Sequence, residues 1–379
     1  VMTIAMGLIA NRPLACASGM GINSIVAYTL CGAMGLGWQT AMAIIFIEGI
    51  AILLLVLCGL REAIMDAIPV SLRHGISIGL GLFIAMIGLK DGGIIVANEA
   101  TMVALGKVTD PVFLVGLISI VATVVLSSMN VKGALLWGIV IASVLGIPLG
   151  VTAAPSSIVA PLDFSTFGAP FMADADGVMG VVKALTTPAL LLFAFSLMMS
   201  DFFDTMGTAM AVAKQGEFLT EDGKVEDIKP ILIVDSVAAA AGGVFGASSI
   251  TTFVESASGA ADGGRSGLTS VTAGVLFLLA AFFSPVISCI SSAATCGALV
   301  YVGFLMMSEV TEVDWSDILE GFPTFMIIVG IPFTYSISNG IGLGFIAYVV
   351  VAAVTGNLKK IRPLMWVAAA AFLAYFLLV

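Results

Sequence analysis

The sequence predicts an all-α polytopic membrane protein, and an internal repeat predicts that it is built from two related halves. Hydrophobic residues make up 60% of its 379 residues and charged residues only 10%. In a soluble domain roughly a quarter of the residues are charged. Apolar runs recur along the chain, each near the roughly 20 residues that a helix needs to cross a bilayer. Runs such as "AMAIIFIEGIAILLLVLCGL" do not alternate in polarity, so we expect helices rather than strands to span the membrane.

The predicted helices follow these apolar runs. They cover residues 1–10, 14–33, 37–60, 74–89, 111–128, 132–151, 188–210, 230–247, 250–265, 267–287, 289–308, 321–338, 340–356 and 363–379. The longer polar connections, 152–187, 211–229 and 309–320, are too short to form a soluble domain.

Two of these segments are rich in residues that interrupt an apolar helix. Residues 14–23 and 248–259 are crowded with Gly, Ser, Thr and Asn. Irregular backbone at membrane depth is tolerated only where it lines a cavity or is buried in protein. Two half-helices that meet there would point free N–H groups at a ligand. The alternative is a close helix–helix contact through small residues.

The internal repeat relates the two broken segments. "ACASGMGINSIVAYTL" precedes a long apolar helix in the first half, and "ASSITTFVESASGAADGG" does so in the second. Such repeats are typical of transporters built from inverted repeats. Two helices precede the broken segment of the second half, but only residues 1–10 precede that of the first. We therefore expect about one and a half further helices upstream of this chain.

Three carboxylates lie inside apolar segments, namely Asp201, Asp204 and Glu255. A charge at the centre of a bilayer costs roughly 3 kcal/mol or more, so intramembrane acids usually face a cavity and mark a substrate or proton path. Asp201 precedes Asp204 by one helical turn, so both can face the same side. The alternative is that each acid only stabilises helix packing. For Glu48 these two roles are equally favoured, and Asp235, near a predicted helix end, is expected to make a cap or loop contact.

Composition and motifs exclude several functions. The net charge of −10 argues against nucleic acid as a partner, because phosphate binding needs a basic patch. The sequence has no metal-binding cluster, phosphate loop or nucleophile with its base, so we expect neither an enzyme nor a cofactor. A channel is a further alternative, but broken helices in both halves favour a carrier.

Five motifs resemble those of one transporter family. They are "SGMGINSIVAY", "LREAIMDAIP", "SDFFDTMGT", "TTFVESASGAADGGRSGLTSV" and "IPFTYSISNGIGLGFI". The chain is similar along essentially its whole length to the azaguanine-resistance type purine permeases, within the nucleobase–cation symporter-2 and nucleobase–ascorbate superfamily. One departure is "ACASGMG", which stands where an Ala-Pro-Gly-Met-Gly run is common.

The resemblance implies fourteen helices in two inverted repeats of seven, with a core and a gate domain. Its third and tenth segments are short strands followed by half-helices. The implied core domain comprises residues 1–60 and 188–287, the gate domain 61–151 and 288–379, and an extracytoplasmic loop 152–187. The apolar tail 363–379 would form a helix beyond the fourteen.

The resemblance also implies the site residues. Asp204 and Glu255 would hold a nucleobase, and these two acids with Asp201 are the candidates for proton coupling. The other expected substrate-binding residues are Thr252, Phe253, Val254, Met20, Gly21 and Asn23. Because burial disfavours the charged form of an acid, such residues can take up and release a proton.

The expected function is import of purine nucleobases of the adenine, guanine and hypoxanthine class by proton symport with alternating access. H⁺ is the expected coupling ion, Na⁺ is not excluded, and homodimerisation is left open. The alternatives are a uracil or xanthine permease of the same fold and, less favoured, an anion carrier, because central carboxylates would repel an anion.

The expected location is the plasma (inner) membrane, which the chain crosses several times, with lipid as a partner. A cytoplasmic N-terminus puts most Lys and Arg residues, among them Arg73, Lys214, Lys224 and Arg362, on the cytoplasmic side, as the positive-inside rule requires. Only Lys90, Lys107 and Lys183 then fall outside.

Overall fold

The computed structural model describes residues 1–19, 22–23, 25–153, 157–220 and 224–378. The described chain is mostly helical and divides into two compact units. The first comprises residues 1–77, 163–275 and 312–379, and the second comprises 78–162 and 276–311. Every candidate site residue that the structure describes belongs to the first unit.

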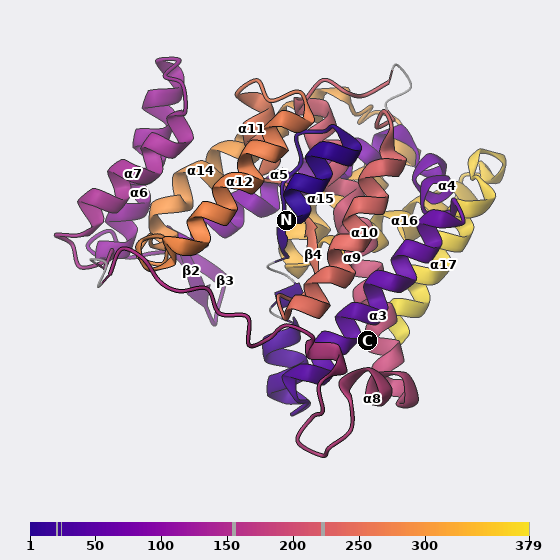
Figure 1. Cartoon of the computed structure of the whole chain (residues 1–379). Helices are drawn as coiled ribbons and strands as arrows, with labels where there is room; N and C mark the ends of the chain where they lie inside the picture. The colour runs from indigo at the N-terminus through magenta and orange to yellow at the C-terminus, as the bar shows by residue number, and fades with distance from the viewer. Residues whose placement is uncertain (20–21, 24, 154–156, 221–223, 379) are drawn as a thin grey trace. The chain divides into compact units, whose positions relative to one another are not determined.

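The first unit contains most of the helices (Figure 1). In chain order they are α1 (Met2–Ala5), the π-helical segments η1 (Met6–Ala10) and η2 (Ile25–Ala33), α3 (Trp38–Leu57), α4 (Leu60–Ala67), the 3₁₀ turn η3 (Ala169–Phe171), α8 (Gly180–Thr186), α9 (Pro188–Gln215), α10 (Ile228–Phe245), α11 (Ser256–Ala261), α15 (Ile318–Thr334), α16 (Ile337–Val354), the 3₁₀ turn η5 (Leu358–Lys360) and α17 (Pro363–Leu378).

The second unit contains a smaller set of helices and a hairpin. Its elements are β2 (Ile95–Asn98), β3 (Met102–Leu105), α6 (Pro111–Ser128), α7 (Ala134–Gly146), α13 (Ser284–Ile287) and α14 (Ser292–Met306). The helices α5 (Val70–Asp91), α12 (Gly267–Phe282) and the 3₁₀ segment η4 (Met307–Glu312) contribute residues to both units. β2 and β3 pair antiparallel with Ile95 opposite Leu105, and the sequence analysis did not predict this hairpin.

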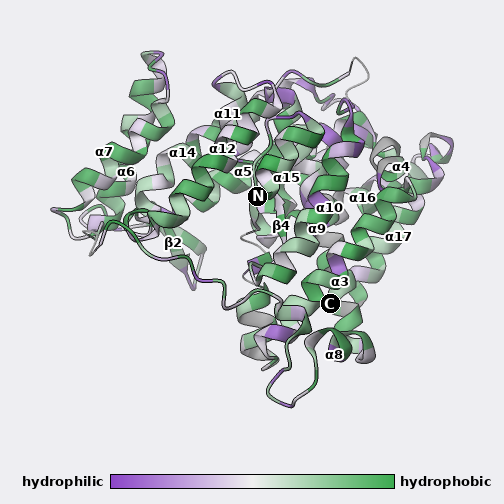
Figure 2. Cartoon of the chain, in the orientation of Figure 1, coloured by the Kyte–Doolittle hydropathy of each residue, from purple (hydrophilic) through white to green (hydrophobic). Residues whose placement is uncertain are grey.

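Hydrophobic residues cover most of the length of helices such as α3 and α17 (Figure 2). Among the described residues, six helices are long and apolar enough to cross a membrane. They are Trp38–Leu57, Val70–Asp91, Pro111–Ser128, Ile228–Phe245, Ser292–Glu312 and Ile337–Val354. Four shorter apolar helices accompany them, Ala134–Gly146, Gly267–Phe282, Ile318–Thr334 and Pro363–Leu377.

Small residues set the closest helix contacts in the first unit. A Cβ added to Gly49 of α3 would lie 2.3 Å from the backbone nitrogen of Ala240 in α10, and one added to Gly243 would lie 2.8 Å from the Met42 carbonyl oxygen. α15 and α16 meet in the same way, because a Cβ on Gly340 would lie 2.4 Å from the Ile331 nitrogen. Such residues let helix backbones approach closely. They hold α3 and α10 together, and both helices carry buried acids.

The two interrupted segments are not continuous helices, so the predicted helices 14–33 and 250–265 are wrong in that respect. Each contains a short strand, β1 (Cys16–Ser18) and β4 (Ile250–Thr252), followed by a helical stretch, η2 or α11. The strands pair antiparallel, with Cys16 opposite Thr252. The strand and half-helix form implied by the resemblance is therefore confirmed. Pairing satisfies backbone groups that an apolar environment would leave without partners.

Candidate functional site

The paired strands β1 and β4 bring together two segments that lie far apart in the sequence. Beyond the strand register, the Phe253 N–H donates to the Ala15 carbonyl at 2.8 Å, and the Ser256 hydroxyl accepts from the Ala15 N–H at 2.9 Å. At the other end the Gly19 N–H donates to the Ser249 carbonyl at 2.9 Å. These bonds fix the start of α11, which Glu255 immediately precedes.

Asp204 and Glu255 lie on neighbouring helical elements. Asp204 is in the middle of α9, Glu255 immediately precedes α11 without a side-chain capping bond, and α9 packs against α11. Both residues are half-buried, so each retains some exposed surface. They are close enough that the charge of Glu255 acts on the Asp204 carboxylate. The two predicted acids therefore lie on packed elements, within range of each other's charge.

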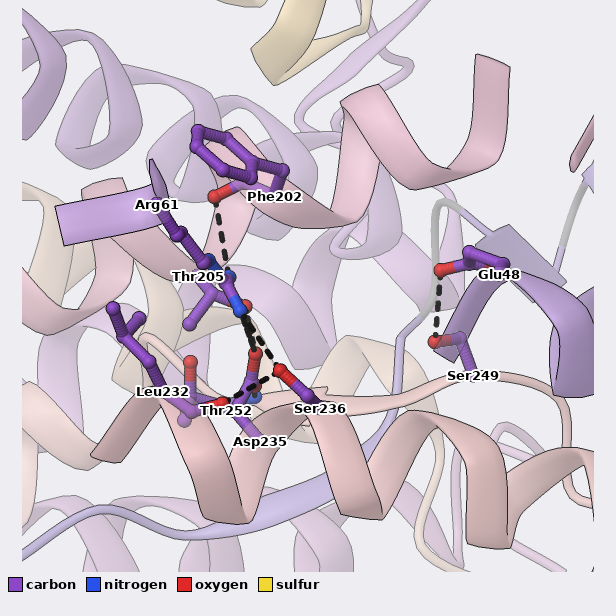
Figure 3. Close-up of polar contacts among 9 residues, drawn as sticks. All are labelled: Glu48, Arg61, Phe202, Thr205, Leu232, Asp235, Ser236, Ser249 and Thr252. Carbon is purple, nitrogen blue, oxygen red and sulfur yellow. Dashed lines mark hydrogen bonds and ion pairs between the residues drawn. The ribbon is translucent and has the colours of Figure 1, made fainter. Parts of the chain in front are cut away.

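Figure 3 shows an ion pair between Arg61 and Asp235 that the sequence analysis did not predict. The charge of Asp235 also acts on Asp204. Arg61 of α4 and Asp235 of α10 have fully buried side chains, and Arg61 Nη1 and Nη2 lie 3.2 and 3.3 Å from Asp235 Oδ2. Arg61 Nη2 also donates to the Phe202 carbonyl of α9 at 3.3 Å, and the guanidinium lies 5.1 Å from the Phe202 ring centroid. Arg61 therefore binds α9 and α10 at once.

Asp235 also connects this hydrogen-bond network to β4, one of the two paired strands. The Thr205 hydroxyl donates to Asp235 Oδ2 at 2.8 Å, and the backbone N–H of Thr252 donates to Asp235 Oδ1 at 3.1 Å. Thr205 follows Asp204 in α9, and Thr252 ends β4. One buried carboxylate thus connects the helix that carries Asp204 to the strand that leads to Glu255.

The expectation of a cap or loop contact for Asp235 is wrong. Asp235 lies inside α10, which begins at Ile228, two turns before it, and its partners are an arginine, a hydroxyl and a strand amide. The apolar run "ILIVDSVAAAA" on both sides of it was the available signal. The positive-inside assignment makes Arg61 one of the cytoplasmic cations, because only Lys90, Lys107 and Lys183 fall outside, and nothing in its local sequence indicates complete burial.

Two further acids are fully buried, Glu48 and Asp201. Glu48 Oε1 accepts a bond from the Ser249 hydroxyl at 3.4 Å, so this residue links α3 to the segment before β4 (Figure 3). Neither carboxylate oxygen of Asp201 has a hydrogen-bond partner among the described residues. The charges of Asp235, Glu48, Arg61 and Asp204 all act on Asp201. Of the acids gathered here, Asp204 and Glu255 are thus the accessible ones.

The remaining predicted site residues lie around the crossing. Thr252 is buried, whereas Phe253, Val254 and Asn23 are half-buried. Ser18 Oγ lies 2.7 Å from Asn23 Oδ1 and 2.6 Å from the Ala247 carbonyl oxygen, and its single hydroxyl proton can be donated to one of them at a time. Met20 and Gly21 lie outside the described residues. Within the described part of the chain, no group of three His, Cys, Asp or Glu side chains is arranged to hold a metal ion.

Comparison with known proteins decides the family. Residues 1–343 match the permease family. The chain belongs to this permease family. It is 40% identical to the adenine permease AdeQ of Escherichia coli over 379 residues, which cover 100% of this chain and 83% of that protein. It is 38% identical to the guanine/hypoxanthine permease PbuO of Bacillus subtilis, with 98% of this chain and 86% of that protein covered. The resemblance to nucleobase–cation symporter-2 proteins is confirmed, and this permease is a multi-pass protein of the cell membrane.

A solved structure shows the same kind of fold. The transmembrane domain of the cyanobacterial bicarbonate transporter BicA superimposes with a TM-score of 0.55 and 15% sequence identity, covering 92% of this permease and 88% of that chain. At this identity the likeness concerns the fold alone. The permease therefore has a transporter fold, and its substrate has to be inferred from its own side chains and its closer relatives.

Proposed function

We propose that this permease is a secondary active transporter that imports purine nucleobases, with the base held between Asp204 and Glu255. The observation that carries the proposal is the placement of these two half-buried carboxylates on packed elements, beside the crossing of β1 and β4. The names of AdeQ and PbuO, an adenine and a guanine/hypoxanthine permease, support a purine as the substrate.

The chemistry of a purine suits this arrangement. The edge of its ring presents N–H donors, which a carboxylate accepts, and its two faces are apolar. Phe253 and Val254 immediately precede Glu255 and are half-buried, so they can contact a ring face. Asn23 of the first broken segment can supply amide groups at the opposite side of the crossing. Met20 and Gly21 remain proposed contacts from the sequence.

Arg61 and Asp235 act in this proposal as positioning residues. Neither is exposed, so neither contacts the substrate. Their bonds to the Phe202 carbonyl, the Thr205 hydroxyl and the Thr252 N–H hold α9 and β4 in a fixed relation. A site that recognises a planar ring through hydrogen bonds needs such support, because a displacement of about 1 Å can remove a directional hydrogen bond.

The transport cycle we propose is proton symport by alternating access. The fold we propose comprises fourteen helices in two inverted repeats of seven. The core domain (1–60 and 188–287), with the adjoining Arg61 bound to it, moves against the rest of the gate domain (61–151 and 288–379). Asp204, Glu255 and Asp201 are the proposed proton carriers, since each lies in the apolar interior of the first unit. Protonation accompanies binding of the base on one side, and both are released into the cytoplasm.

Uptake of radiolabelled adenine, guanine and hypoxanthine into proteoliposomes tests this function. We expect saturable uptake that an inward-directed proton gradient accelerates, with uptake lost in Asp204→Asn and Glu255→Gln. Asp262→Asn is the matched control, because Asp262 is an exposed acid at the other end of α11. Uptake that ignores the gradient would refute proton coupling, and normal uptake by both acid variants would refute the proposed site.

A uracil or xanthine permease of the same fold is the second candidate. The same two acids could hold a pyrimidine or an oxidised purine, so the candidates differ in ligand shape rather than in site chemistry. Competition of unlabelled uracil, xanthine, adenine and guanine for the labelled purine separates them. Stronger competition by uracil or xanthine than by any of the other bases would favour this second candidate.

A further inference from the structure

A large cavity of the first unit lies away from the acids described above. Its volume is about 1040 Å³. It is surrounded by the end of α9, the junction of α4 and α5, Tyr348 of α16 and Arg362, which immediately precedes α17. The lining residues are Ala67, Ile68, Pro69, Val70, Arg73, His74, Ala213, Lys214, Glu217, Leu219, Thr220, Lys224, Tyr348 and Arg362. None of the candidate site residues is among them.

Positive charge is concentrated around this cavity. Arg73, Lys214, Lys224 and Arg362 are four of the 14 Lys and Arg residues in a chain of net charge −10, and His74 is its single histidine. Among the described lining residues the one carboxylate is Glu217, and Glu217 Oε1 pairs with Arg265 Nη2 at 3.1 Å. Arg265 does not line the cavity. Basic side chains therefore outnumber acidic ones among the described lining residues.

Local structure holds several of these groups at the wall. Arg73 is buried, and its Nε–H donates to the Ile68 carbonyl at 3.0 Å, which fixes the plane of the guanidinium. Lys224 is half-buried, and backbone hydrogen bonds join it to Thr220, 2.8 Å from the Thr220 N–H to the Lys224 carbonyl and 3.1 Å from the Lys224 N–H to the Thr220 hydroxyl. Lys214 lies in the last turn of α9. Hydrogen bonds or helical structure therefore position three of these cations.

The cavity suits a ligand that is both anionic and partly apolar. Val70 and Pro69 bring the start of the 22-residue helix α5 to the wall, where first-turn N–H groups have no partner within the helix. Ala67, Ile68, Ala213 and Leu219 add apolar surface. Organic ligands usually occupy cavities of roughly 300–1,000 Å³, so this volume exceeds the need of a bare inorganic ion.

We propose that this cavity binds the phosphate ester of an organic anion, with Arg73, Lys214, Lys224 and Arg362 surrounding the phosphate. Arginine and lysine side chains with helix N-termini are the groups that proteins use for phosphate. Two sources share this chemistry, the headgroup of an anionic phospholipid and a soluble phosphate ester. Basic pockets between helices on the cytoplasmic side of membrane proteins suit lipid headgroups. The proposal does not depend on the identity of the transported base.

Ligand-induced thermal stabilisation of the purified full chain tests the proposal. The probes are dioctanoyl phosphatidylglycerol, dioctanoyl phosphatidylcholine as the zwitterionic control, and glycerol 3-phosphate with adenosine monophosphate as soluble phosphate esters. We expect phosphatidylglycerol to raise the unfolding temperature more than phosphatidylcholine does, and salt to reduce the effect. An equal rise with a soluble ester would identify the soluble source.

A pair of charge-matched double variants makes the test specific. Lys214→Gln with Arg362→Gln removes two charges from the cavity, whereas Lys132→Gln with Lys229→Gln removes two exposed charges elsewhere. We expect the affinity for the anionic probe to fall roughly tenfold or more in the first variant and to stay unchanged in the second. If the first variant does not fold, the single variant Lys214→Gln replaces it, since Lys214 is exposed. No shift of the wild-type protein with any phosphate ester, or equal loss in both variants, would overturn the proposal.

Discussion

The backbone N–H of Thr252 donates to Asp235 Oδ1 at 3.1 Å, although the two residues belong to different elements, β4 and α10. The other oxygen of this carboxylate faces Arg61 of α4 and Thr205 of α9. A single buried acid therefore joins four elements around the proposed site.

Arg61→Met is expected to destabilise the protein by about 3–5 kcal/mol, because it leaves Asp235 buried without its counter-ion. Arg265→Met is the control, since Arg265 forms an exposed pair with Glu217 and such pairs contribute about 0–1 kcal/mol. Thermal unfolding of the purified variants measures both effects. A second change, Asp235→Leu, should restore much of the stability lost in Arg61→Met. Equal unfolding temperatures for the two arginine variants would show that the buried pair is not structurally required.

Asp201→Asn is expected to leave purine affinity within about threefold of the wild-type value, because a fully buried side chain cannot touch the base. Glu255→Gln should weaken binding roughly tenfold or more, since it removes a charged acceptor at an accessible position. Isothermal titration calorimetry with adenine and guanine measures both affinities. If Asp201 takes part in proton coupling, uptake by Asp201→Asn also responds less to a pH gradient. Weakening of binding in Asp201→Asn as large as in Glu255→Gln would place Asp201 in contact with the base.

Gly49→Ala is expected to lower stability by about 1–3 kcal/mol, because its added Cβ would meet the α10 backbone at Ala240, 2.3 Å from its nitrogen. The neighbouring Glu48 would be displaced from Ser249 as the helices separate. Gly259→Ala is the control, since a Cβ there has no heavy atom within 4 Å. Unfolding temperature and purine affinity are the measurements. A stable Gly49→Ala variant with unchanged affinity would mean that α3 and α10 can separate without cost to the site.

The loop before α8 is expected to open in acid. The Lys183 ammonium donates to Asp176 at 2.6 Å and to Asp174 at 3.1 Å, and Asp174 also accepts from the Thr40 hydroxyl at 2.9 Å. The bond from Lys183 lowers the pKa of Asp176. Burial alone would raise the pKa of Asp174, but its bonds from Ala175, Thr40 and Lys183 outweigh burial and lower it.

Because both pKa values are lowered, the stabilisation is complete above the unfolded value of about 3.9 and is lost as pH falls through the folded values. The protection of this loop's amides, measured as the intrinsic exchange rate divided by the observed rate at the same pH, should therefore fall as pH drops below about 4. Lys183→Met should show low protection already at neutral pH, whereas Lys107→Met, at an exposed lysine outside this loop, should not. Protection that does not change with pH in the wild-type protein would contradict the prediction.

Composition and motifs alone predict the class of protein, the course of most helices and the two acids Asp204 and Glu255. Long apolar runs can be satisfied in a bilayer only as helices, so the segments 111–128 and 363–379 could be located by composition alone. The sequence indicates Asp204 and Glu255 because a carboxylate in an apolar run costs free energy and therefore usually has a function. The Gly- and Ser-rich runs around Gly19 and Ser256 showed where the helices are interrupted, but not that the interruptions pair as strands.

The tertiary structure decided which polar groups meet. The pairing of Cys16 with Thr252, the bond from Thr252 to Asp235 and the burial of Arg61 all join residues more than ten positions apart. Local sequence sets backbone preference and hydrophobic periodicity, whereas the partner of a buried charge depends on which helices pack together. Arg61 therefore resembles an ordinary interfacial cation in the sequence, and only the packing of α4 against its neighbours makes it the buried counter-ion of Asp235.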